Sequence, residues 1–460
     1  MNRAIDLLLR DLATVLPAAS LLHDEASRIA YSYDNSRRSV LPDAVALPES
    51  IEQIGAIVAQ CAERRVPLVA RGRGTNTTGA SVPIHGGLVL SCERMGRIVE
   101  VDPDDRVAVV EAGVLNGDLQ IAAAQHGLFW APDPTSAPFC TVGGNLACNA
   151  GGPRAVKYGA SRDNTLALRC VDGRGQIHRL GSRTTKGATG YDLMRLVIGS
   201  EGTLAVIAEA TLKLLPKPES VRTLRALYRD VEAAAAAVAR LMRQPQVPCA
   251  LEFMDAEAVR LAREIGGADI PAAGALLMIE VDGPEIAMTH AVAAIERAAA
   301  GDGLLRIDAA QSDAETEQLW AARKALSPAL KHVAPKKINE DVVVPVSKLP
   351  ALVAKTRELA ARSGIAIVCF GHAGNGNLHV NLMFDPANPA QAAAAPGVLS
   401  ELFATTLALG GTLSGEHGIG LDKRDFMPQA IAAPTLALMG AVKAQFDPAG
   451  ILNPGKLLPP

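Results

Sequence analysis

The sequence is poor in the features that mark several large classes of protein. Aromatic residues make up 3% of its 460 residues, and the formal net charge is −3. Because no basic run with interleaved aromatic side chains occurs, nothing indicates nucleic-acid binding. No uncharged apolar run is long enough to span a bilayer. The segment 1–19 is interrupted by Asp6, Arg10 and Asp11, which predicts an amphipathic helix rather than a signal peptide.

Cysteine is also scarce, and its spacing carries no motif. The seven cysteines are scattered, and no two of them form a Cys-x-x-Cys pair. The spacing therefore suggests neither a structural zinc site nor an iron–sulfur cluster. We expect reduced thiols in the core, which are typical of a cytosolic protein. The expected location is the cytoplasm, with peripheral contact at the inner face of a membrane left open.

Apolar residues, by contrast, are plentiful at 49%, enough for the cores of two or three domains. A Pro-rich linker at 216–219 separates a glycine- and strand-rich part from a part in which alanine-rich helices alternate with strands. These patterns predict an α+β protein with domains at 1–217 and 218–460. The elements expected most clearly are helices at 49–66, 231–242 and 291–300, strands at 67–70, 275–281, 365–370 and 378–384, and an Ala/Pro-rich loop at 387–396.

Two histidines seven residues apart, His372 and His379, are the most informative local feature. Each adjoins an apolar segment of strand type, and the residues between them are mostly Gly and Asn, which tolerate positive φ angles. A hairpin of this kind would bring both imidazoles to facing ends of neighbouring strands. Period-two alternation places His379 and Asn381 on one face.

A second glycine-rich segment, 414–420, adds Glu416 and His417. Two histidines and one glutamate make a three-ligand site with open positions for a divalent metal. The alternative is a set of unconnected polar residues in loops. We favour the site because three of only nine histidines gather with a glutamate in glycine-rich turns. Zinc is the first expectation, and manganese, iron or cobalt would also suit these ligands.

Glycine-rich loops recur in the first part of the chain. The loop 71–79 directly follows a strand, but it matches neither the dinucleotide fingerprint nor a P-loop. Similar turns beside Ser, Thr and Asn occur at 132–136, 141–152 and 199–204. Their backbone N–H groups could approach phosphate oxygens at several points. Loops of this spread suit a phosphate-bearing cofactor longer than one nucleotide.

The order of these motifs resembles the FAD-binding domain of the vanillyl-alcohol oxidase superfamily, through segments 67–75, 132–134, 141–145, 191–193 and 199–204. The segments 371–379, 414–420 and 452–456 are similar to its D-2-hydroxy-acid dehydrogenase branch. That branch includes D-lactate dehydrogenases, D-2-hydroxyglutarate dehydrogenases and the FAD-linked subunit of glycolate oxidase. The resemblance covers about residues 40–458. It implies a two-part FAD-binding domain of the PCMH type (core about 38–217), then a substrate domain with an antiparallel sheet and helices, and a C-terminal tail that returns to the flavin.

The resemblance also implies which residues hold FAD. Those expected around the pyrophosphate are Arg71, Gly72, Arg73, Gly74, Thr75 and Asn76. Those expected along the pyrophosphate and flavin are Pro132, Asp133, Pro134, Thr135, Gly143, Gly144 and Asn145. Those expected at the ribityl and adenine portions are Gly199, Glu201, Gly202, Thr203 and Ile207, with Asn453 near the isoalloxazine ring. Family members with covalent flavin carry a histidine in the first loop, and this loop has none, so we expect non-covalent FAD.

Oxidation of a 2-hydroxy acid removes the hydroxyl proton and transfers a hydride to flavin N5. A cation held by His372, His379 and Glu416, as the family also implies, could accept the hydroxyl and carboxylate oxygens of the substrate and lower the hydroxyl pKa. His417 fits the general base, although it could instead only orient the substrate.

Three further residues are candidates for substrate contacts. Arg323 lies on an expected helix with Trp320 and Ser327 at one-turn spacing, and the family places an arginine there against the substrate carboxylate. Lys337 is a weaker candidate, because family members vary at its strand. Asn381 could bond the substrate or a metal ligand. The alternative for Arg323 and Lys337 is that they are solvated basic side chains without a functional role, and the alternative for Asn381 is a hydrogen-bonded amide in a turn.

Other functions remain open at this stage. A metallohydrolase would use the same three ligands but would leave the glycine loops without a role. A non-catalytic flavin-binding subunit would be expected to lack the metal ligands. Within the family, an oxidase that uses O₂ competes with a dehydrogenase that passes electrons to a separate quinone, cytochrome or electron-transfer flavoprotein. A small 2-hydroxy acid is the expected substrate, no nucleic-acid partner is expected, and a homodimer is an open possibility.

Overall fold

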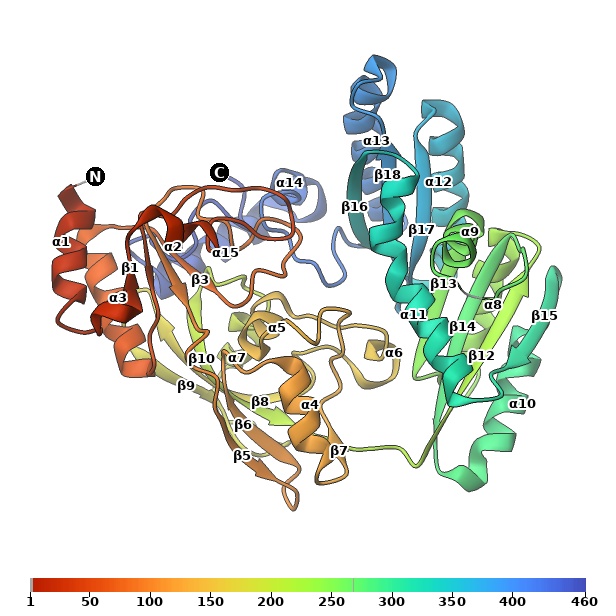
Figure 1. The fold of residues 1–460 in the computed structure, drawn as a ribbon, viewed down its shortest axis with the longest axis horizontal. Coiled ribbons are helices and arrows are strands. Elements are labelled where there is room, and N and C mark those ends of the chain that lie inside the picture. The colour runs from red at the N-terminus through yellow and green to blue at the C-terminus, as the bar shows by residue number, and fades with distance from the viewer. Residues whose placement is uncertain (1–2, 268) are drawn as a thin grey trace. The chain divides into compact units, whose positions relative to one another are not determined.

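The computed structural model describes residues 3–267 and 269–460, which form two compact units (Figure 1). The first unit contains the described residues up to Gly152, Gly159–Lys217 and Glu416–Pro460. The second contains Pro153–Tyr158 and Pro218–Gly415. Residues 416–460 thus group with the first unit, although they lie within the sequence-based domain 218–460.

The first unit contains two main sheets and the helices around them. Its helices are α1 (Arg3–Leu12), α2 (Glu25–Ile29), α3 (Ile51–Arg64), α4 (Asn116–Ala124), α5 (Val142–Cys148), α7 (Leu193–Val197), α14 (Met427–Ala430) and α15 (Ala433–Phe446). Its strands are β1 (Leu21–Leu22), β2 (Ala44–Ala46), β3 (Leu68–Arg71), β4 (Leu88–Ser91), β5 (Ile98–Asp102), β6 (Val107–Glu111), β7 (Leu128–Phe129), β8 (Thr165–Asp172), β9 (Ile177–Gly181), β10 (Ala205–Lys213) and β11 (Leu215–Pro216). The strand orders are β1-β2-β4-β3 and β5-β6-β10-β8-β9.

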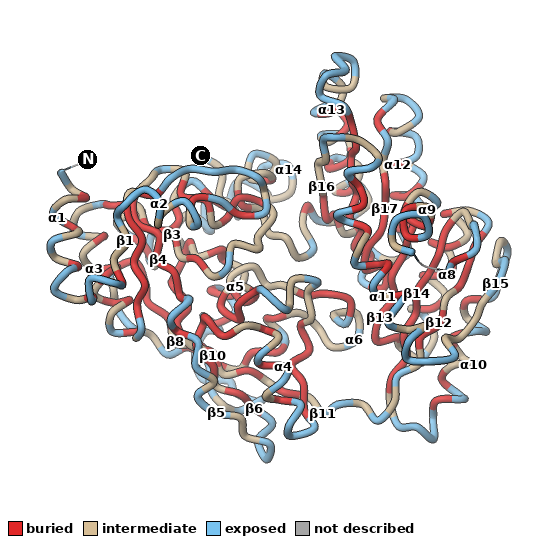
Figure 2. Tube along the Cα trace, in the orientation of Figure 1, coloured by how far each residue is buried: buried red, intermediate tan, exposed pale blue. Residues whose placement is uncertain are grey.

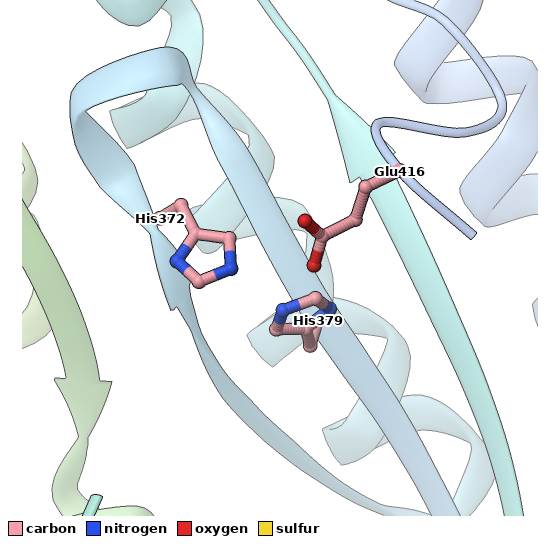
Figure 3. Close-up of side chains that lie close together, drawn as sticks. All are labelled: His372, His379 and Glu416. Atoms are coloured by element: carbon pink, nitrogen blue, oxygen red, sulfur yellow. The ribbon is translucent and has the colours of Figure 1, made fainter. Parts of the chain in front are cut away.

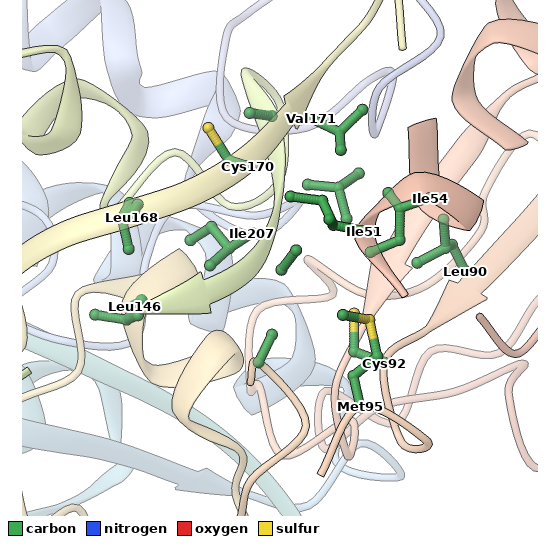
Figure 4. Close-up of a cluster of buried hydrophobic side chains, with 14 of the residues drawn as sticks. Ile51, Ile54, Leu90, Cys92, Met95, Leu146, Leu168, Cys170, Val171 and Ile207 are labelled. Carbon is green, nitrogen blue, oxygen red and sulfur yellow. The ribbon is translucent and has the colours of Figure 1, made fainter. Parts of the chain in front are cut away.

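Helix α3 shows how the sequence builds this core. The Ser50 side chain caps its first turn by accepting a hydrogen bond from the backbone N–H of Gln53. Ile54, Ile57 and Cys61 recur at helical spacing, and all three are buried. They belong to one apolar cluster with side chains from both sheets, part of which is drawn in Figure 4. The helix therefore ties the two sheets of the first unit together.

The second unit contains a single large sheet with helices on both faces. Its helices are α6 (Ala155–Tyr158), α8 (Val231–Arg243), α9 (Ala256–Glu264), α10 (Met288–Ala299), α11 (Asp313–Ala329), α12 (Leu349–Ser363) and α13 (Pro389–Ala408). Its strands are β12 (Ser220–Tyr228), β13 (Ala250–Asp255), β14 (Ala275–Gly283), β15 (Leu304–Ala309), β16 (Lys336–Val343), β17 (Ala366–His372) and β18 (Asn377–Phe384). The sheet is antiparallel, in the order β15-β12-β14-β13-β17-β18-β16.

The two faces of this sheet carry different helices. Helices α9 and α11 pack on one face, where they share an apolar cluster with Met254, Met278 and Phe370. Helices α8, α10, α12 and α13 pack against one another and the sheet on the opposite face (Figure 1). Figure 2 shows that the strands between these two layers are mostly buried. A polar side chain on any central strand therefore lies in the interior and needs a partner.

One sequence-based expectation is wrong. The segment 387–396, expected to be a loop, lies largely in helix α13. Asn388 caps this helix by accepting from the N–H groups of Ala390 and Gln391, and Pro389 occupies the first turn, where its missing N–H costs nothing. The alanines that follow have high helix propensity, which outweighs the internal Pro396. The Ala/Pro-rich composition of this segment is therefore that of a capped helix rather than of a loop.

Helix α1 spans part of the segment 1–19 for which an amphipathic helix was expected. It covers Arg3–Leu12 and buries Ile5, Leu8 and Leu12. Helices with the length and apolar character needed to cross a membrane are not found among residues 3–267 and 269–460.

Candidate functional site

The two histidines of the sequence motif lie on adjacent strands, as predicted. Strands β17 and β18 pair antiparallel, with Phe370 opposite His379, and the turn between them ends at Gly376. The imidazole rings of His372 and His379 lie 5.2 Å apart at an interplanar angle of 84°. Both side chains are buried, each with 7% of its surface exposed. The hairpin therefore presents two imidazoles at one point.

Glu416 completes a three-ligand group with these histidines (Figure 3). One potential ligand atom from each residue lies within 4.8 Å of the other two. Ligands that bind one cation at about 2.1 Å lie about 3–4 Å apart, so this spacing suits a shared ion. Glu416 directly follows Gly415, whose N–H donates to the Asp341 carboxylate at 2.9 Å. Asp341 lies opposite His379 in the sheet, and this contact holds the chain just before Glu416.

A buried carboxylate that sequence reasoning missed, Glu252, lies beside His372. Its Oε1 is 2.6 Å from His372 Nδ1, and its Oε2 accepts a hydrogen bond from Arg323 Nε at 2.8 Å and forms an ion pair with Arg323 Nη2 at 2.7 Å. Burial by itself raises the pKa of Glu252, but the charges of His372 and Arg323 and the hydrogen bond to His372 outweigh it and lower the pKa to about 2. Glu252 is therefore a carboxylate at neutral pH.

The predicted substrate contacts lie on the same face of the second unit. Arg323 is buried, with its guanidinium carbon 4.8 Å above the Phe370 ring. Lys337 Nζ donates to Ser327 Oγ at 3.0 Å. The Asn381 amide donates to the carbonyl oxygens of Val368 and His379, while its own Oδ1 is buried without a hydrogen-bond partner among the described residues.

The first glycine loop begins at the end of β3, as expected. Arg71 is buried there, and burial lowers its pKa. Gly72 packs so closely that a Cβ atom would lie 2.3 Å from Thr141 Oγ1. Gly74 has a φ of +66°, which favours glycine. Arg73 is exposed, and Thr75 and Asn76 are partly buried.

The remaining residues predicted to hold FAD lie at three other places in the first unit. Pro132, Asp133, Pro134 and Thr135 form the turn after β7, and the backbone of Asp133 bonds to Gly151. Gly143, Gly144 and Asn145 form the first turns of α5, which Thr141 caps through the N–H of Gly144. Gly199, Glu201, Gly202 and Thr203 precede β10, with φ angles of +86°, +54° and +71° at the first three. Ile207, on β10 itself, packs into the apolar cluster.

Buried polar atoms test whether these loops fit a cofactor. In the first unit, five such atoms have no hydrogen-bond partner among the described residues: Arg71 Nη1, Thr77 Oγ1, Asn145 Nδ2, Arg162 Nε and Ser200 Oγ. All but Arg162 Nε belong to glycine-rich segments predicted to hold the cofactor, 71–79, 141–152 and 199–204. Unpaired buried polar groups are rare and costly unless a ligand completes them. The first unit therefore fits a polar, phosphate-bearing group at these loops.

The loop 417–421 is attached to the same part of the first unit. Asn76 donates to the carbonyl oxygen of His417 at 3.0 Å. The Glu201 carboxylate accepts the N–H groups of Ile419 at 2.6 Å and Gly420 at 2.8 Å. Glu201 was expected to contact the ribityl and adenine portions of FAD. Both of its carboxylate oxygens instead accept hydrogen bonds from this loop. Asn453 donates to the carbonyl oxygens of Ala80 and Glu201, which ties the C-terminal tail to the residue after loop 71–79 and to loop 199–204.

The sequence does contain a signal for the missed carboxylate, Glu252. Glu252 stands between Leu251 and Phe253 in an apolar strand, and both of those side chains are buried. A charged residue at such a position must have an interior partner, because an unpaired buried charge is very costly. The sequence could therefore have marked Glu252 as a residue of interest, but not which residues it contacts.

Comparisons with known proteins show that the chain is related to flavin-binding oxidoreductases. Residues 42–181 match the family model described as FAD binding domain, and residues 217–457 match that of the FAD linked oxidases, C-terminal domain. The glycolate oxidase subunit GlcD of Bacillus subtilis (strain 168) is 39% identical over 434 residues, which are 94% of this chain and 92% of that protein. The D-2-hydroxyglutarate dehydrogenase of Stutzerimonas stutzeri (strain A1501) is 34% identical over 465 residues, 98% of each chain.

Solved structures support the fold alone. The chain superposes on p-cresol methylhydroxylase with a TM-score of 0.83 at 15% identity, covering 100% of this chain and 98% of that one. An alkyldihydroxyacetonephosphate synthase gives a TM-score of 0.73 at 20% identity, with 98% and 85% covered. The glycine loops, the two-unit fold and the family models together show that the chain belongs to the FAD-linked oxidases, a family of flavin-dependent oxidoreductases.

Proposed function

We propose that this protein oxidises a D-2-hydroxy acid to the 2-oxo acid, with non-covalent FAD in the first unit and a divalent cation at His372, His379 and Glu416. The convergence of these three ligands in a chain with an FAD-binding domain carries the proposal. Relatives are named for glycolate, D-lactate and D-2-hydroxyglutarate, which share a hydroxyl group beside a carboxylate. The reacting end of the substrate is therefore common to all, and only its far end differs.

Each residue near the cation site has a role in this proposal. When bound, FAD accepts a hydride at N5 and the cation acts as a Lewis acid toward the hydroxy acid. Arg323 keeps Nη1 for the substrate carboxylate while its other nitrogens hold Glu252. His417 takes the hydroxyl proton. Asn381 offers its buried Oδ1 to the substrate, and Lys337 adds positive charge at the neighbouring strand.

We propose that a separate quinone, cytochrome or electron-transfer flavoprotein would take the electrons from bound flavin. The seven cysteines are all free thiols, six of them buried, and they carry no motif for a cluster that could relay electrons. Reoxidation of the reduced flavin by a soluble quinone, compared with reoxidation by O₂, separates a dehydrogenase from an oxidase.

The decisive test is a dye-reduction screen of D-2-hydroxy acids with the purified protein, before and after exhaustive chelation. Activity should disappear on chelation and return with Zn²⁺, Mn²⁺ or Co²⁺, and a methyl ester of the acid should be inert. His379→Ala should abolish turnover while the flavin stays bound, because the flavin loops lie elsewhere. His290→Ala, an exposed histidine on α10, is the matched control and should be fully active.

Two results would overturn the proposal. Activity of His379→Ala in metal-free buffer would remove the cation from the mechanism. A colourless protein without a flavin spectrum would favour the metallohydrolase.

A further inference from the structure

Glu252 is placed where two candidate substrate-binding groups meet. It lies on β13 with 0% of its surface exposed, and the sheet register sets it opposite His372 on β17 and Met278 on β14. Side chains that face each other across paired strands share one face of the sheet. That face is covered by α9 and α11, and α11 carries Arg323. Glu252 is thus enclosed between the sheet and the helix.

The two oxygens of Glu252 serve different residues. Oε1 contacts His372 Nδ1 at 2.6 Å, and Oε2 accepts a hydrogen bond from Arg323 Nε and forms an ion pair with Arg323 Nη2. A carboxylate can only accept hydrogen bonds, so Nδ1 of His372 must carry the proton. In a neutral imidazole the lone pair then lies on Nε2, which is the form a metal ligand needs. The same carboxylate also fixes the direction of the Arg323 guanidinium.

We propose that Glu252 is a positioning residue that sets both the tautomer of His372 for the cation and the orientation of Arg323 for the substrate carboxylate. This inference rests on the proposed function above. In this role the Glu252 carboxylate compensates the charge of Arg323, which would otherwise be an unpaired cation in the interior. The same carboxylate accepts the hydrogen bond from His372 Nδ1 and so orients the imidazole as a metal ligand. The cation site and the anion-binding arginine are thereby coupled through a single side chain.

Glu280 provides a matched control on the same face of the sheet. It lies on β14 with 5% of its surface exposed, and its Oε1 accepts hydrogen bonds from Thr223 Oγ1 at 2.7 Å and Trp320 Nε1 at 2.6 Å. Trp320 belongs to α11, as Arg323 does. Glu280 therefore shares the residue type, the burial and the helix partner of Glu252, but its carboxylate accepts from a threonine and a tryptophan rather than from a histidine and an arginine.

The experiment compares Glu252→Gln with Glu280→Gln in the FAD-loaded, chelator-treated protein. Zn²⁺ affinity is measured by competition with a chromophoric chelator, and coordination by the visible spectrum of the Co²⁺ form. Glutamine would donate its amide N–H to Nδ1 of His372 or confront Arg323 with an N–H group, so it either moves the His372 proton to Nε2 or breaks the arginine contact. We expect Zn²⁺ affinity to fall by about 10–100-fold and the Co²⁺ spectrum to change in Glu252→Gln. Glu280→Gln should retain both.

Folding and the wild-type site are checked in parallel. Flavin content and the thermal midpoint show whether Glu252→Gln folds. Should it fail, Glu252→Asp, which keeps the charge but is too short to reach both partners, carries the test and should weaken Zn²⁺ binding at least several-fold. Unchanged Zn²⁺ affinity in the folded Glu252 variant, or an equal loss in Glu280→Gln, overturns this inference alone. A wild-type protein that does not bind Zn²⁺ overturns the metal part of the proposed function and this inference with it.

Discussion

Replacing Gly376 by alanine should disrupt the hairpin that carries His372 and His379. Gly376 ends the turn between β17 and β18 with a φ of +71°, in the left-handed region. A Cβ atom at this position would lie 1.9 Å from the carbonyl oxygen of Val344, well inside any contact distance. The N–H of Val344 also donates to the carbonyl oxygen of Gly376 at 3.0 Å, so the alanine variant must move a hydrogen-bonded backbone pair.

Two costs determine the size of the effect. A left-handed conformation costs an L-residue about 1–2 kcal/mol. Relief of the clash separates Gly376 from Val344, and loss of their hydrogen bond costs about 0.5–1.5 kcal/mol. The free energy of unfolding of the second unit should therefore fall by about 2–3 kcal/mol in Gly376→Ala, and the displaced hairpin should bind Zn²⁺ at least tenfold more weakly, because ligand positions must be held closely.

Gly364→Ala separates the two costs. Gly364 follows α12 in the same unit with a φ of +66°, and a Cβ atom there would meet nothing within 4 Å. This control should lose only the conformational term, about 1–2 kcal/mol, and should keep its Zn²⁺ affinity.

The chain has two tryptophans, so a Trp130→Phe background leaves Trp320 as the fluorescence reporter of urea unfolding in the second unit. Equal losses of stability in the two variants, or full Zn²⁺ affinity in Gly376→Ala, would refute the reasoning.

Two further predictions concern buried charges. Arg71→Met should bind FAD at least tenfold more weakly in a flavin-fluorescence titration, because it removes a buried cation whose Nη1 has no hydrogen-bond partner among the described residues. The apoprotein should be no less stable, and unchanged FAD affinity would contradict this reasoning. Burial raises the pKa of Asp255, the N-cap of α9, from 3.8 to about 7. The folded state thus binds more protons than the unfolded chain between these values, so stability falls as pH rises through this window, by up to about 4 kcal/mol. Asp255→Asn should flatten that pH dependence in thermal melts, and an unchanged slope would count against the assignment.

The parts of the site that sequence could predict depend on local patterns. The hairpin followed from two apolar segments and a Gly/Asn turn between them, and the structure confirms it with Phe370 opposite His379. Strand alternation also placed His379 and Asn381 on one face, as the pairing of Asn381 with Val368 shows. The glycine loops followed from turn residues directly after strands. Each of these signals acts within about ten residues.

The parts that sequence could not predict depend on strand order. Glu252 meets His372 only because β13 lies beside β17, although 120 positions separate the two residues. Asp341 meets Gly415 because β16 is the edge strand beside β18. No periodicity or motif within one segment contains that information. The wrong expectation of a loop at 387–396 has a different cause. The Ala/Pro composition suggests a loop, but Asn388 is a helix N-cap, and this local signal predicts the helix that forms there.

The face of the sheet beneath α9 and α11 explains why these distant partners were needed. Its apolar side chains form the cluster around Met254, Met278 and Phe370, so every charged group among them is inside the protein. Such a face folds only if each charge has a partner that the fold itself supplies. Glu252 has Arg323, and Glu280 has neutral donors. The fold thus supplies a hydrogen-bond or ion-pair partner for each of these two carboxylates, whereas the position of His372 and His379 depends on the local geometry of the hairpin.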